Sequence, residues 1–374
     1  MTGEDSLDTA HSRPLRVGIL VDTFAQPRWA LSVLQDIRLS PYADLVATIR
    51  NATPPPSLSL SQRLARKWRS FLYGWYTAWD DRKYATPEDP LVMCDAKRLL
   101  GTVTVIDAVP RMTLHTDRFE DDDIRRIREL DLDVILRFGF RLLRGAILGC
   151  ARYGVWSYHH GDNRQYRGGP PCFWEVAEGN TVSGSMLQVI TEELDAGQVL
   201  YRSYGRTDPH SVRKTRQECY GTAQQFVLRK LQDVYLHGRA GLGTHTNLQP
   251  SWVPYSNRLY VAPTNGEMLH FFWVLLRRRV VAKSRSMFQP TRWILAYHFD
   301  RTSTAPVGTE LVPPRSRVFH RFKPIIPPRG QLWADPFPLR VDGKFYVFFE
   351  NWRVGGGNGH IAVMEWKGDG QWGT

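Results

Sequence analysis

Two side chains able to move protons, His159 and Asp195, each stand where a predicted strand runs into a loop. His159 ends the apolar run 154–159, which predicts a buried strand, and Asp195 lies in the turn 192–197 between two strand-like segments. The 36 residues from one to the other are enough for a helix and a returning strand. Open α/β sheets place their chemistry at the carboxyl ends of parallel strands. We therefore expect the imidazole and the carboxylate to face one cleft, where both suit proton transfer.

The segments around this pair predict a doubly wound, mostly parallel α/β sheet. Strand-like runs at 16–22 and 45–50 flank a helical run at 29–38, which makes a βαβ opening. No G-x-G-x-x-G turn follows the first strand, so a dinucleotide-binding fingerprint is absent. The later expected elements are strands at 103–107, 133–136, 184–190 and 198–202, and helices at 121–130 and 212–237.

The run Ser157-Tyr-His-His-Gly-Asp-Asn-Arg-Gln-Tyr-Arg-Gly168 is similar, without a gap, to the motif Asn-x-His-Pro-Ser-Leu-Leu-Pro-x-x-x-Gly. That motif belongs to the folate-dependent formyltransferases, the family of glycinamide ribonucleotide, methionyl-tRNA and sugar N-formyltransferases. Ser157 falls on the family's asparagine, His159 on its histidine, and Asp195 on the aspartate of its Leu-Asp-x-Gly turn. The resemblance covers roughly residues 15–240 and predicts the family's fold there.

The resemblance implies formyl transfer from 10-formyltetrahydrofolate to an amino group. His159 would stabilise the formyl oxyanion or relay a proton, and Asp195 would orient it or accept the amine proton through water. The Ser157 hydroxyl would replace one hydrogen bond of the missing asparagine amide. The residues implied for the folate pocket are Phe138, Gly139, Phe140, Arg141, Leu142 and Glu193. Those implied for the acceptor side are His160, Asp162, Asn163, Arg164, Arg167 and Gly168.

Plainer alternatives stand beside these assignments. Phe138 and Phe140, next to a buried strand, also fit the role of core aromatics, and Arg164 and Arg167 fit a phosphate site or an ordinary loop equally well. The segment 160–164 is polar and charged where the family has an apolar stretch. Two further functions therefore stay open. One is a deformylase or hydrolase, in which water replaces the amine, and the other is a catalytically silent scaffold for a glycan-binding or glycosyltransferase propeller.

The amino-acid composition indicates which kinds of partner the protein binds. A formal charge of +12 over 374 residues indicates an anionic partner, such as a phosphorylated substrate, nucleic acid or membrane surface. We expect a small-molecule or sugar amine acceptor and no specific nucleic acid, because nothing resembles the tRNA-binding barrel of the methionyl-tRNA subfamily. Four cysteines without a C-x-x-C pair predict reduced thiols, and we expect no metal site. Residues 1–14 lack a secretory pattern and the apolar run 269–276 is too short to span a bilayer, so we expect a cytoplasmic protein, with peripheral membrane contact as an alternative.

Two aromatic and basic segments each have two interpretations. Residues 61–84 carry Trp68, Trp75 and Trp79 at helical spacing among arginines. They predict a helix that docks on a membrane or partner, or one that packs its aromatic stripe on its own domain, as apolar stripes more often do. Residues 268–283 pair an apolar half with three arginines and predict a surface-lying helix or an ordinary packed helix with a solvated basic end.

The composition along the chain predicts four regions. They are a disordered tail at 1–14, the formyltransferase-like domain at 15–240, a linker with a basic helix at 241–310, and a β-rich segment at 311–374. In the last, Ala334-Asp-Pro-Phe337 followed by Tyr346-Val-Phe-Phe-Glu350 resembles the opening blade of glycosidase-related five-bladed propellers, including the one associated with glucosamine inositolphosphorylceramide transferases. We expect a partial propeller of about one blade, which would make this chain a fragment. Only this resemblance favours an amino-sugar or glycoconjugate acceptor.

Overall fold

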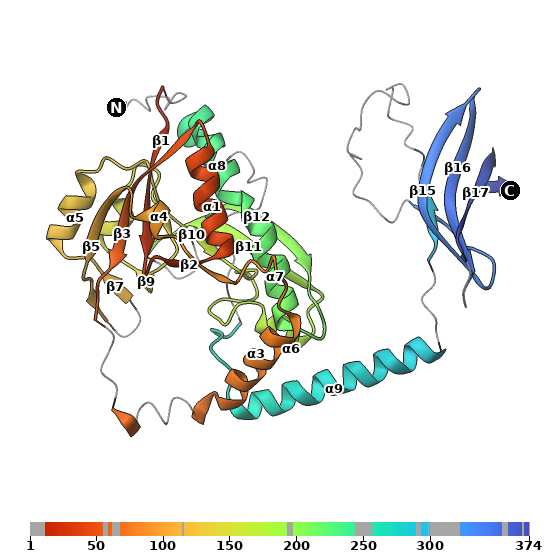
Figure 1. Cartoon of the computed structure of the whole chain (residues 1–374), viewed down its shortest axis with the longest axis horizontal. Coiled ribbons are helices and arrows are strands. Elements are labelled where there is room, and N and C mark those ends of the chain that lie inside the picture. The colour runs from red at the N-terminus through yellow and green to blue at the C-terminus, as the bar shows by residue number, and fades with distance from the viewer. Residues whose placement is uncertain are drawn as a thin grey trace. The chain divides into compact units, whose positions relative to one another are not determined.

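The computed structural model describes residues 12–54, 59–61, 68–113, 116–192, 197–243, 255, 257–288, 293–297, 299, 322–353, 358–368 and 370–373. By its contacts the chain divides into two compact units, residues 1–279 and 280–374, and each is described by itself (Figure 1).

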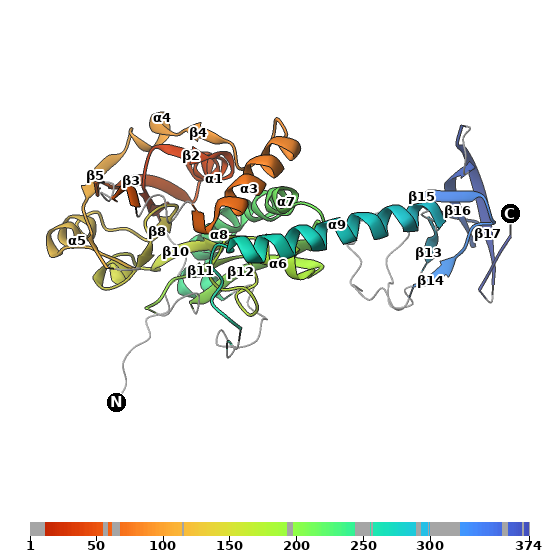
Figure 2. The same ribbon diagram turned by 90° about the horizontal axis from the view of Figure 1, so that it is seen from below.

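The first unit is built on a seven-stranded sheet. In spatial order its strands are β12 (Gln198–Arg206), β11 (Val182–Val189), β10 (Val155–His159), β8 (Val134–Arg137), β1 (Leu15–Val21), β3 (Ala43–Asn51) and β5 (Thr104–Ala108). The five strands from β10 to β5 pair in parallel, whereas β11 and β12 run antiparallel at one edge (Figure 2). The expected mostly parallel α/β sheet is confirmed.

Helices cover both faces of this sheet because its central strands are apolar on both sides. In β1 every residue except Arg16 is buried, the near-continuous apolar run typical of parallel strands. On one face, α1 (Arg28–Leu39) and α8 (Gln225–His237) bury Val33 and Leu231 in a large apolar cluster. On the other, Leu20 of β1 packs in a cluster with Ile124 of α5 (Asp121–Arg128) and Ile147 of the 3-10 turn η1 (Ala146–Gly149).

A third apolar cluster joins four helices of the same unit. They are α3 (Phe71–Tyr84), α6 (Phe173–Glu178), α7 (Val212–Ala223) and α9 (Asn265–Phe288). Every one of the four contributes buried residues to the cluster, among them Tyr76, Phe173, Val212 and Phe271. The single helix expected at 212–237 is two helices, α7 and α8, that meet at Gln224. Among the described helices, none combines the length and the apolar content that crossing a bilayer requires.

Short elements complete the first unit. They are β2 (Ala25–Pro27), β4 (Met93–Asp95), α4 (Lys97–Leu100), β6 (Arg111–Met112), β7 (Thr116–Arg118), β9 (Leu142–Leu143) and η2 (Gly238–Leu242). The small sheet β6-β7-β9 matters for the site, because the pairing of Thr116 with Leu142 fixes the loop that leaves β8.

The second unit holds two small antiparallel sheets. One pairs β13 (Leu295–Tyr297) with β14 (Lys323–Ile325), and the other has the order β15 (Gln331–Val341), β16 (Lys344–Arg353), β17 (His360–Gly368) and β18 (Gln371–Gly373). Asp342 and Gly343 both have positive φ angles, 49° and 78°, and form the two-residue turn between β15 and β16. Trp333, Phe349 and Met364 are buried in the hydrophobic core of the second unit. The β-rich character expected here is confirmed, whereas the propeller stays a prediction.

Candidate functional site

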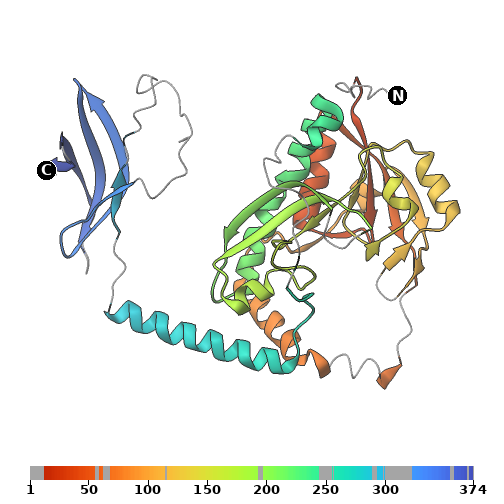
Figure 3. The ribbon, with the colours of Figure 1, turned by 180° about the vertical axis from the view of Figure 1, so that it is seen from behind.

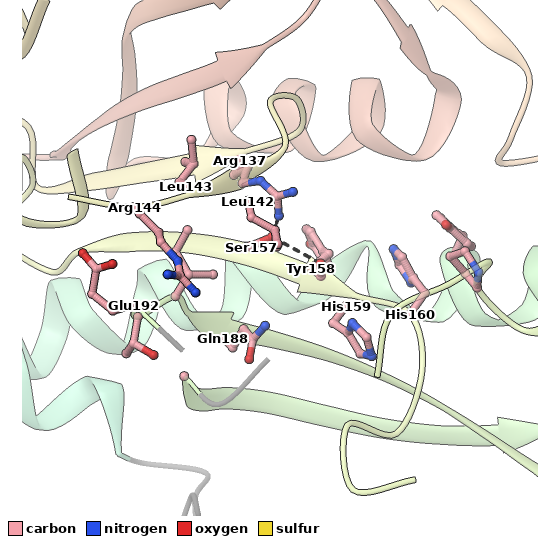
Figure 4. A pocket seen from close by; sticks show the side chains of 16 residues that line it. Arg137, Leu142, Leu143, Arg144, Ser157, Tyr158, His159, His160, Gln188 and Glu192 are labelled. Atoms are coloured by element: carbon pink, nitrogen blue, oxygen red, sulfur yellow. Dashed lines mark hydrogen bonds between the residues drawn. The ribbon is translucent and has the colours of Figure 1, made fainter. Parts of the chain in front are cut away.

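A pocket of about 320 Å³ runs along β10, bordered by the ends of β8 and β11 (Figure 4). We call it the β10 pocket. Its lining residues are Arg137, Leu142, Leu143, Arg144, Ser157, Tyr158, His159, His160, Gly168, Pro171, Gln188, Ile190, Thr191, Glu192, Gly197 and Tyr220. It therefore brings together Ser157, His159, His160, Leu142 and Gly168 from the predicted site. Asp195 and Glu193 lie outside the described residues, directly beyond the lining residue Glu192.

Ser157 is buried and held by an arginine that the sequence analysis did not single out. The parallel pairing of β8 and β10 sets Ser157 opposite Arg137. The Arg137 Nη1 donates to the Ser157 Oγ at 2.8 Å, and its Nη2 donates to the carbonyl of Phe140 at 3.2 Å. The Ser157 hydroxyl in turn donates to the carbonyl of Tyr158 at 3.2 Å. A positive charge thus stands beside Ser157, at the position where the family motif has asparagine. The signal for it in the sequence was a charged residue at the end of an apolar strand.

His159 is half-buried at the end of β10 and is tethered through one ring nitrogen. Its Nε2 lies 3.0 Å from the carbonyl oxygen of Tyr166. Because a carbonyl oxygen only accepts, this contact assigns the proton to Nε2. A neutral His159 ring therefore has an unprotonated Nδ1, which is the atom able to take a proton.

His160 has a different environment from its neighbour. It is 8% exposed and stacks on Tyr220, with ring centroids 3.5 Å apart, while Trp29 meets its edge at 5.3 Å. Burial lowers the pKa of His160 to about 3, with a further contribution from the charge of His159. This ring is therefore neutral at physiological pH, and its Nε2 has no hydrogen-bond partner among the described residues.

The loop after His160 is occupied by its own hydrogen bonds. Asp162 accepts from Arg164 at 3.1 Å, and the buried Asn163 accepts from Arg202 at 2.7 Å. Arg167 donates to the carbonyl of Asn163 at 2.9 Å and lies over the ring of Tyr255. Asp162, Asn163, Arg164 and Arg167 are not among the residues that line the β10 pocket. A contact between these four residues and an acceptor stays a prediction.

The predicted folate loop, 138–142, packs and hydrogen-bonds against neighbouring elements, and only its last residue lines the pocket. Phe138 packs on Trp29 and Phe140 on Phe119, with ring centroids 5.4 and 5.2 Å apart. Arg141 makes two side-chain hydrogen bonds to Asp117, at 2.9 and 2.6 Å. At Gly139 a Cβ would stand 2.3 Å from the backbone nitrogen of Asp22, so this close approach requires glycine. Leu142 alone of the five lines the β10 pocket.

Polar residues that the sequence analysis passed over also line the pocket. Gln188 pairs with Ser157 across the antiparallel register of β10 and β11, and it is a polar residue within a buried strand. The Glu192 Oε1 accepts from the backbone nitrogen of Gly145 at 2.8 Å and ties the two loops of the pocket together. Arg144 adds a second guanidinium to the lining (Figure 4).

A small cavity of about 10 Å³ adjoins the β10 pocket and is lined by His160, Gly168, Pro171 and, on α6, Glu175. Glu175 is 2% exposed, and its Oε1 has no partner among the described residues. Burial, with the charge of Glu178 adding to it, raises the pKa of Glu175 to about 7. A cavity of this size holds about one water molecule. The unpartnered polar atoms of His160 and Glu175 are suited to hydrogen-bond such a molecule.

No protein-family model matches the chain. A methionyl-tRNA formyltransferase from Bacteroides fragilis is 30% identical over 88 residues, which are 23% of this chain and 27% of that protein. One from Prochlorococcus marinus is 27% identical over 105 residues, 28% of this chain and 32% of that protein. Glycinamide ribonucleotide transformylase 1 from Symbiobacterium toebii aligns with TM-score 0.40 and 14% identity over 59% of this chain and 90% of its own. The chain spans about a third or less of the curated relatives, and that stretch is similar in sequence to formyltransferases, as the motifs predicted.

Proposed function

We propose that the β10 pocket transfers a formyl group from 10-formyltetrahydrofolate to an amine. The observation that carries the proposal is the alignment of Arg137, Ser157 and His159 along one wall of a pocket that Glu192 and Gly197 also line. Acyl transfer to an amine places negative charge on the carbonyl oxygen while the amine loses a proton. The Arg137 guanidinium beside the Ser157 hydroxyl can stabilise this negative charge, and the His159 imidazole can accept the proton. The sequence similarity to methionyl-tRNA formyltransferases supports the same reaction.

Each residue has one role in the step. The amine nitrogen bonds to the formyl carbon, the formyl oxygen takes the negative charge, and the bond from that carbon to the folate nitrogen then breaks. Arg137 donates a hydrogen bond to the oxyanion, and Ser157 donates a second once its hydroxyl turns away from the Tyr158 carbonyl. The Nδ1 of His159 takes the amine proton and returns a proton to the departing nitrogen. Asp195, outside the described residues, is proposed to orient His159.

The lining of the β10 pocket fits the reacting end of the proposed donor. Leu142, Leu143 and Ile190 offer an apolar wall for a flat ring, and Gln188 and Glu192 offer polar edges. The volume of about 320 Å³ is at the small end of ligand pockets, so it suits the bicyclic ring and the formyl group with the rest of the folate outside. The donor supplies the formyl group and the leaving nitrogen.

The acceptor is proposed to be an amino-sugar or glycoconjugate, and the protein is proposed to act in the cytoplasm. The support for the sugar is the propeller-like sequence at 334–350, which forms β15 and β16 here. One observation favours deformylation as a second candidate. Arg137, Arg144 and Gln188 make much of the lining polar, and such a wall can hold a water molecule where the amine would attack.

The test is release of tetrahydrofolate from 10-formyltetrahydrofolate, measured with and without a panel of amino-sugars. Formyl transfer predicts release that depends on the acceptor, and release that His159→Ala and Asp195→Asn both reduce. His237→Ala, an exposed histidine at the end of α8, is the matched control and should keep full turnover.

The other outcomes separate the alternatives. Formate produced without an acceptor identifies a deformylase. Turnover retained in both His159→Ala and Asp195→Asn contradicts the proposed site. Absence of folate binding by calorimetry, in a folded protein, contradicts the proposed function and favours the silent scaffold.

A further inference from the structure

Helix α9 carries two apolar stripes, and only one of them packs on the first unit. Met268, Phe271 and Leu275 are at most 4% exposed and complete the third apolar cluster. A second stripe, Leu269, Trp273 and Leu276, repeats at helical spacing and is 57–62% exposed. One packed stripe is what an amphipathic helix needs for its own domain. The second stripe is therefore left over.

Helix α3 and the turn before it repeat this arrangement. Tyr76 is 1% exposed in the cluster, whereas Trp68, Phe71 and Trp75 are 50–70% exposed and spaced as one face of a helix. Of the aromatic stripe expected from the sequence, Leu72 and Trp79 pack on the domain, and Trp68 and Trp75 face outward. Packing on its own domain thus describes one side of this helix, and docking by the other side stays a prediction.

The two exposed stripes lie side by side. The Asn265 side chain accepts from the backbone nitrogen of Leu72 and donates to the carbonyl of Trp68, which joins the starts of the two helices. Farther along, Trp75 meets the edge of Phe272, with ring centroids 6.0 Å apart. Figures 1 and 3, seen from opposite sides, both show α3 alongside the start of α9. We call the six residues Trp68, Phe71, Trp75, Leu269, Trp273 and Leu276 the α3–α9 surface.

The charges around the α3–α9 surface are one-sided. Asp81 pairs with Arg213, and Glu267 pairs with Arg258, so these carboxylates are neutralised. Asp80 is buried, at 1% exposed. The exposed cations, in contrast, have no ion-pair partner among the described residues: Arg69, Arg277 and Arg279. Arg277 lies over the ring of Trp273, 5.9 Å from its centroid.

A groove next to the same helix repeats this positive character. It has a volume of about 640 Å³ and lies between α6 and α9. Its lining includes His270, Arg277 and Arg278 beside the α3–α9 surface, and the carboxylates of Glu178 and Glu267, which are bonded to Tyr260 and Arg258. The groove is large enough for a phosphate-bearing head group.

We propose that the α3–α9 surface docks the protein on an anionic lipid bilayer. Tryptophan and phenylalanine enter the boundary between head groups and acyl chains, while arginines beside them meet anionic head groups. Contiguous exposed apolar patches on soluble proteins mark sites of interaction. The surplus of unpaired arginines selects an anionic bilayer over an uncharged apolar partner. Since no described helix is fit to cross a membrane, α9 lies in the surface of the bilayer.

The test is flotation of the full chain with vesicles of phosphatidylcholine alone and of phosphatidylcholine with an equal amount of phosphatidylserine. The protein should float with the anionic vesicles only, and less so at about 0.5 M salt, where charges are screened. The double variants Trp75→Ser/Trp273→Ser and Arg277→Glu/Arg279→Glu should each lower the binding constant by at least about tenfold. Circular dichroism checks that both variants fold.

Matched controls come from the same unit. Leu39→Ser removes an apolar side chain that is 84% exposed on α1, and Arg98→Glu reverses an exposed charge on α4. Both should bind vesicles as the parent does.

Failure of the parent to float, or equal losses in the control variants, overturns the proposal. A concentration-dependent dimer in light scattering that the Trp75→Ser/Trp273→Ser variant abolishes, without vesicle binding, overturns it in favour of a second copy of this chain. Vesicle binding does not depend on catalysis, so this test is independent of the test of formyl transfer.

Discussion

Four consecutive residues, 157–160, at the end of β10 and directly after it lie in two different environments. Ser157 and His159 belong to a wall where polar groups meet, with Arg137 across from the serine and the Tyr166 carbonyl at the histidine. Tyr158 and His160 belong instead to an aromatic stack with Trp29 and Tyr220. Alternation along a strand separates the two sets. The difference shows that residue type alone does not define a site, since one histidine lies among polar groups and burial in the aromatic stack holds the next one neutral.

The largest expected effect comes from a direct test of the difference between His159 and His160. Replacing His159 with Gln removes the proposed proton carrier and should lower formyl transfer by about 10²–10⁴-fold. Replacing His160 with Phe keeps an aromatic ring in the stack, so turnover should stay within about tenfold of the parent. The measurement is kcat for tetrahydrofolate release. Equal losses in both variants, each folded, would show that the aromatic stack takes part in the chemistry.

The second effect concerns the charge on the polar wall. Arg137→Ala removes the donor that faces the proposed oxyanion and should lower kcat by about 10²–10³-fold with a smaller change in KM. Arg137→Lys should recover little, because an ammonium cannot hold Ser157 and the Phe140 carbonyl with the geometry of a guanidinium. A rise in KM with unchanged kcat would instead place Arg137 in ground-state binding.

The fold was predictable wherever apolar periodicity was strong. Residues 16–22, 45–50 and 154–159 are nearly continuous apolar runs, and they form β1, β3 and β10. The expectation of one helix at 212–237 missed a break, because the apolar spacing continues across Gln224, where α7 ends and α8 begins. Periodicity reports which face is buried, and it does not report a break that keeps the same face inward.

The site was predictable in part, for a physical reason. Ser157 and His159 were found because a motif places them, and the structure sets both in one pocket. Arg137, Arg144 and Gln188 were missed because their role depends on which strands become neighbours, and pairing over tens of residues leaves no local pattern. The roles of Asp195 and Glu193 stay predictions, since both lie outside the described residues.

A third prediction tests how the buried carboxyl of Glu175, which lines the small cavity beside His160, affects the stability of the fold. Its pKa is about 7 in the folded protein against an ordinary value of 4.5, so the folded state holds the proton more tightly than the unfolded state. The free energy of unfolding should therefore fall as pH rises from about 4.5 to 7, by on the order of 1–3 kcal/mol. Glu175→Gln removes this pH dependence. As pH rises from about 4.5 to 7, the free energy of unfolding of the variant should therefore increase relative to that of the parent. Urea unfolding at pH 5 and pH 8 measures it, with Glu129→Gln on exposed backbone after α5 as the control.

The smallest expected effect sharpens the role of Ser157, where this chain departs from the formyltransferase motif. The Oγ accepts from Arg137 and donates to the Tyr158 carbonyl, so one hydroxyl links the guanidinium to the strand. Ser157→Ala breaks that link and should lower turnover by about tenfold, on the order of the contribution of one hydrogen bond. In Ser157→Asn the amide oxygen can still accept from Arg137 while its nitrogen donates toward the oxyanion, so turnover should equal or exceed that of the parent. If Ala and Asn both match the parent in tetrahydrofolate release, the hydroxyl contributes nothing to catalysis. Arg137 would then hold the oxyanion alone, or the pocket would transfer no formyl group.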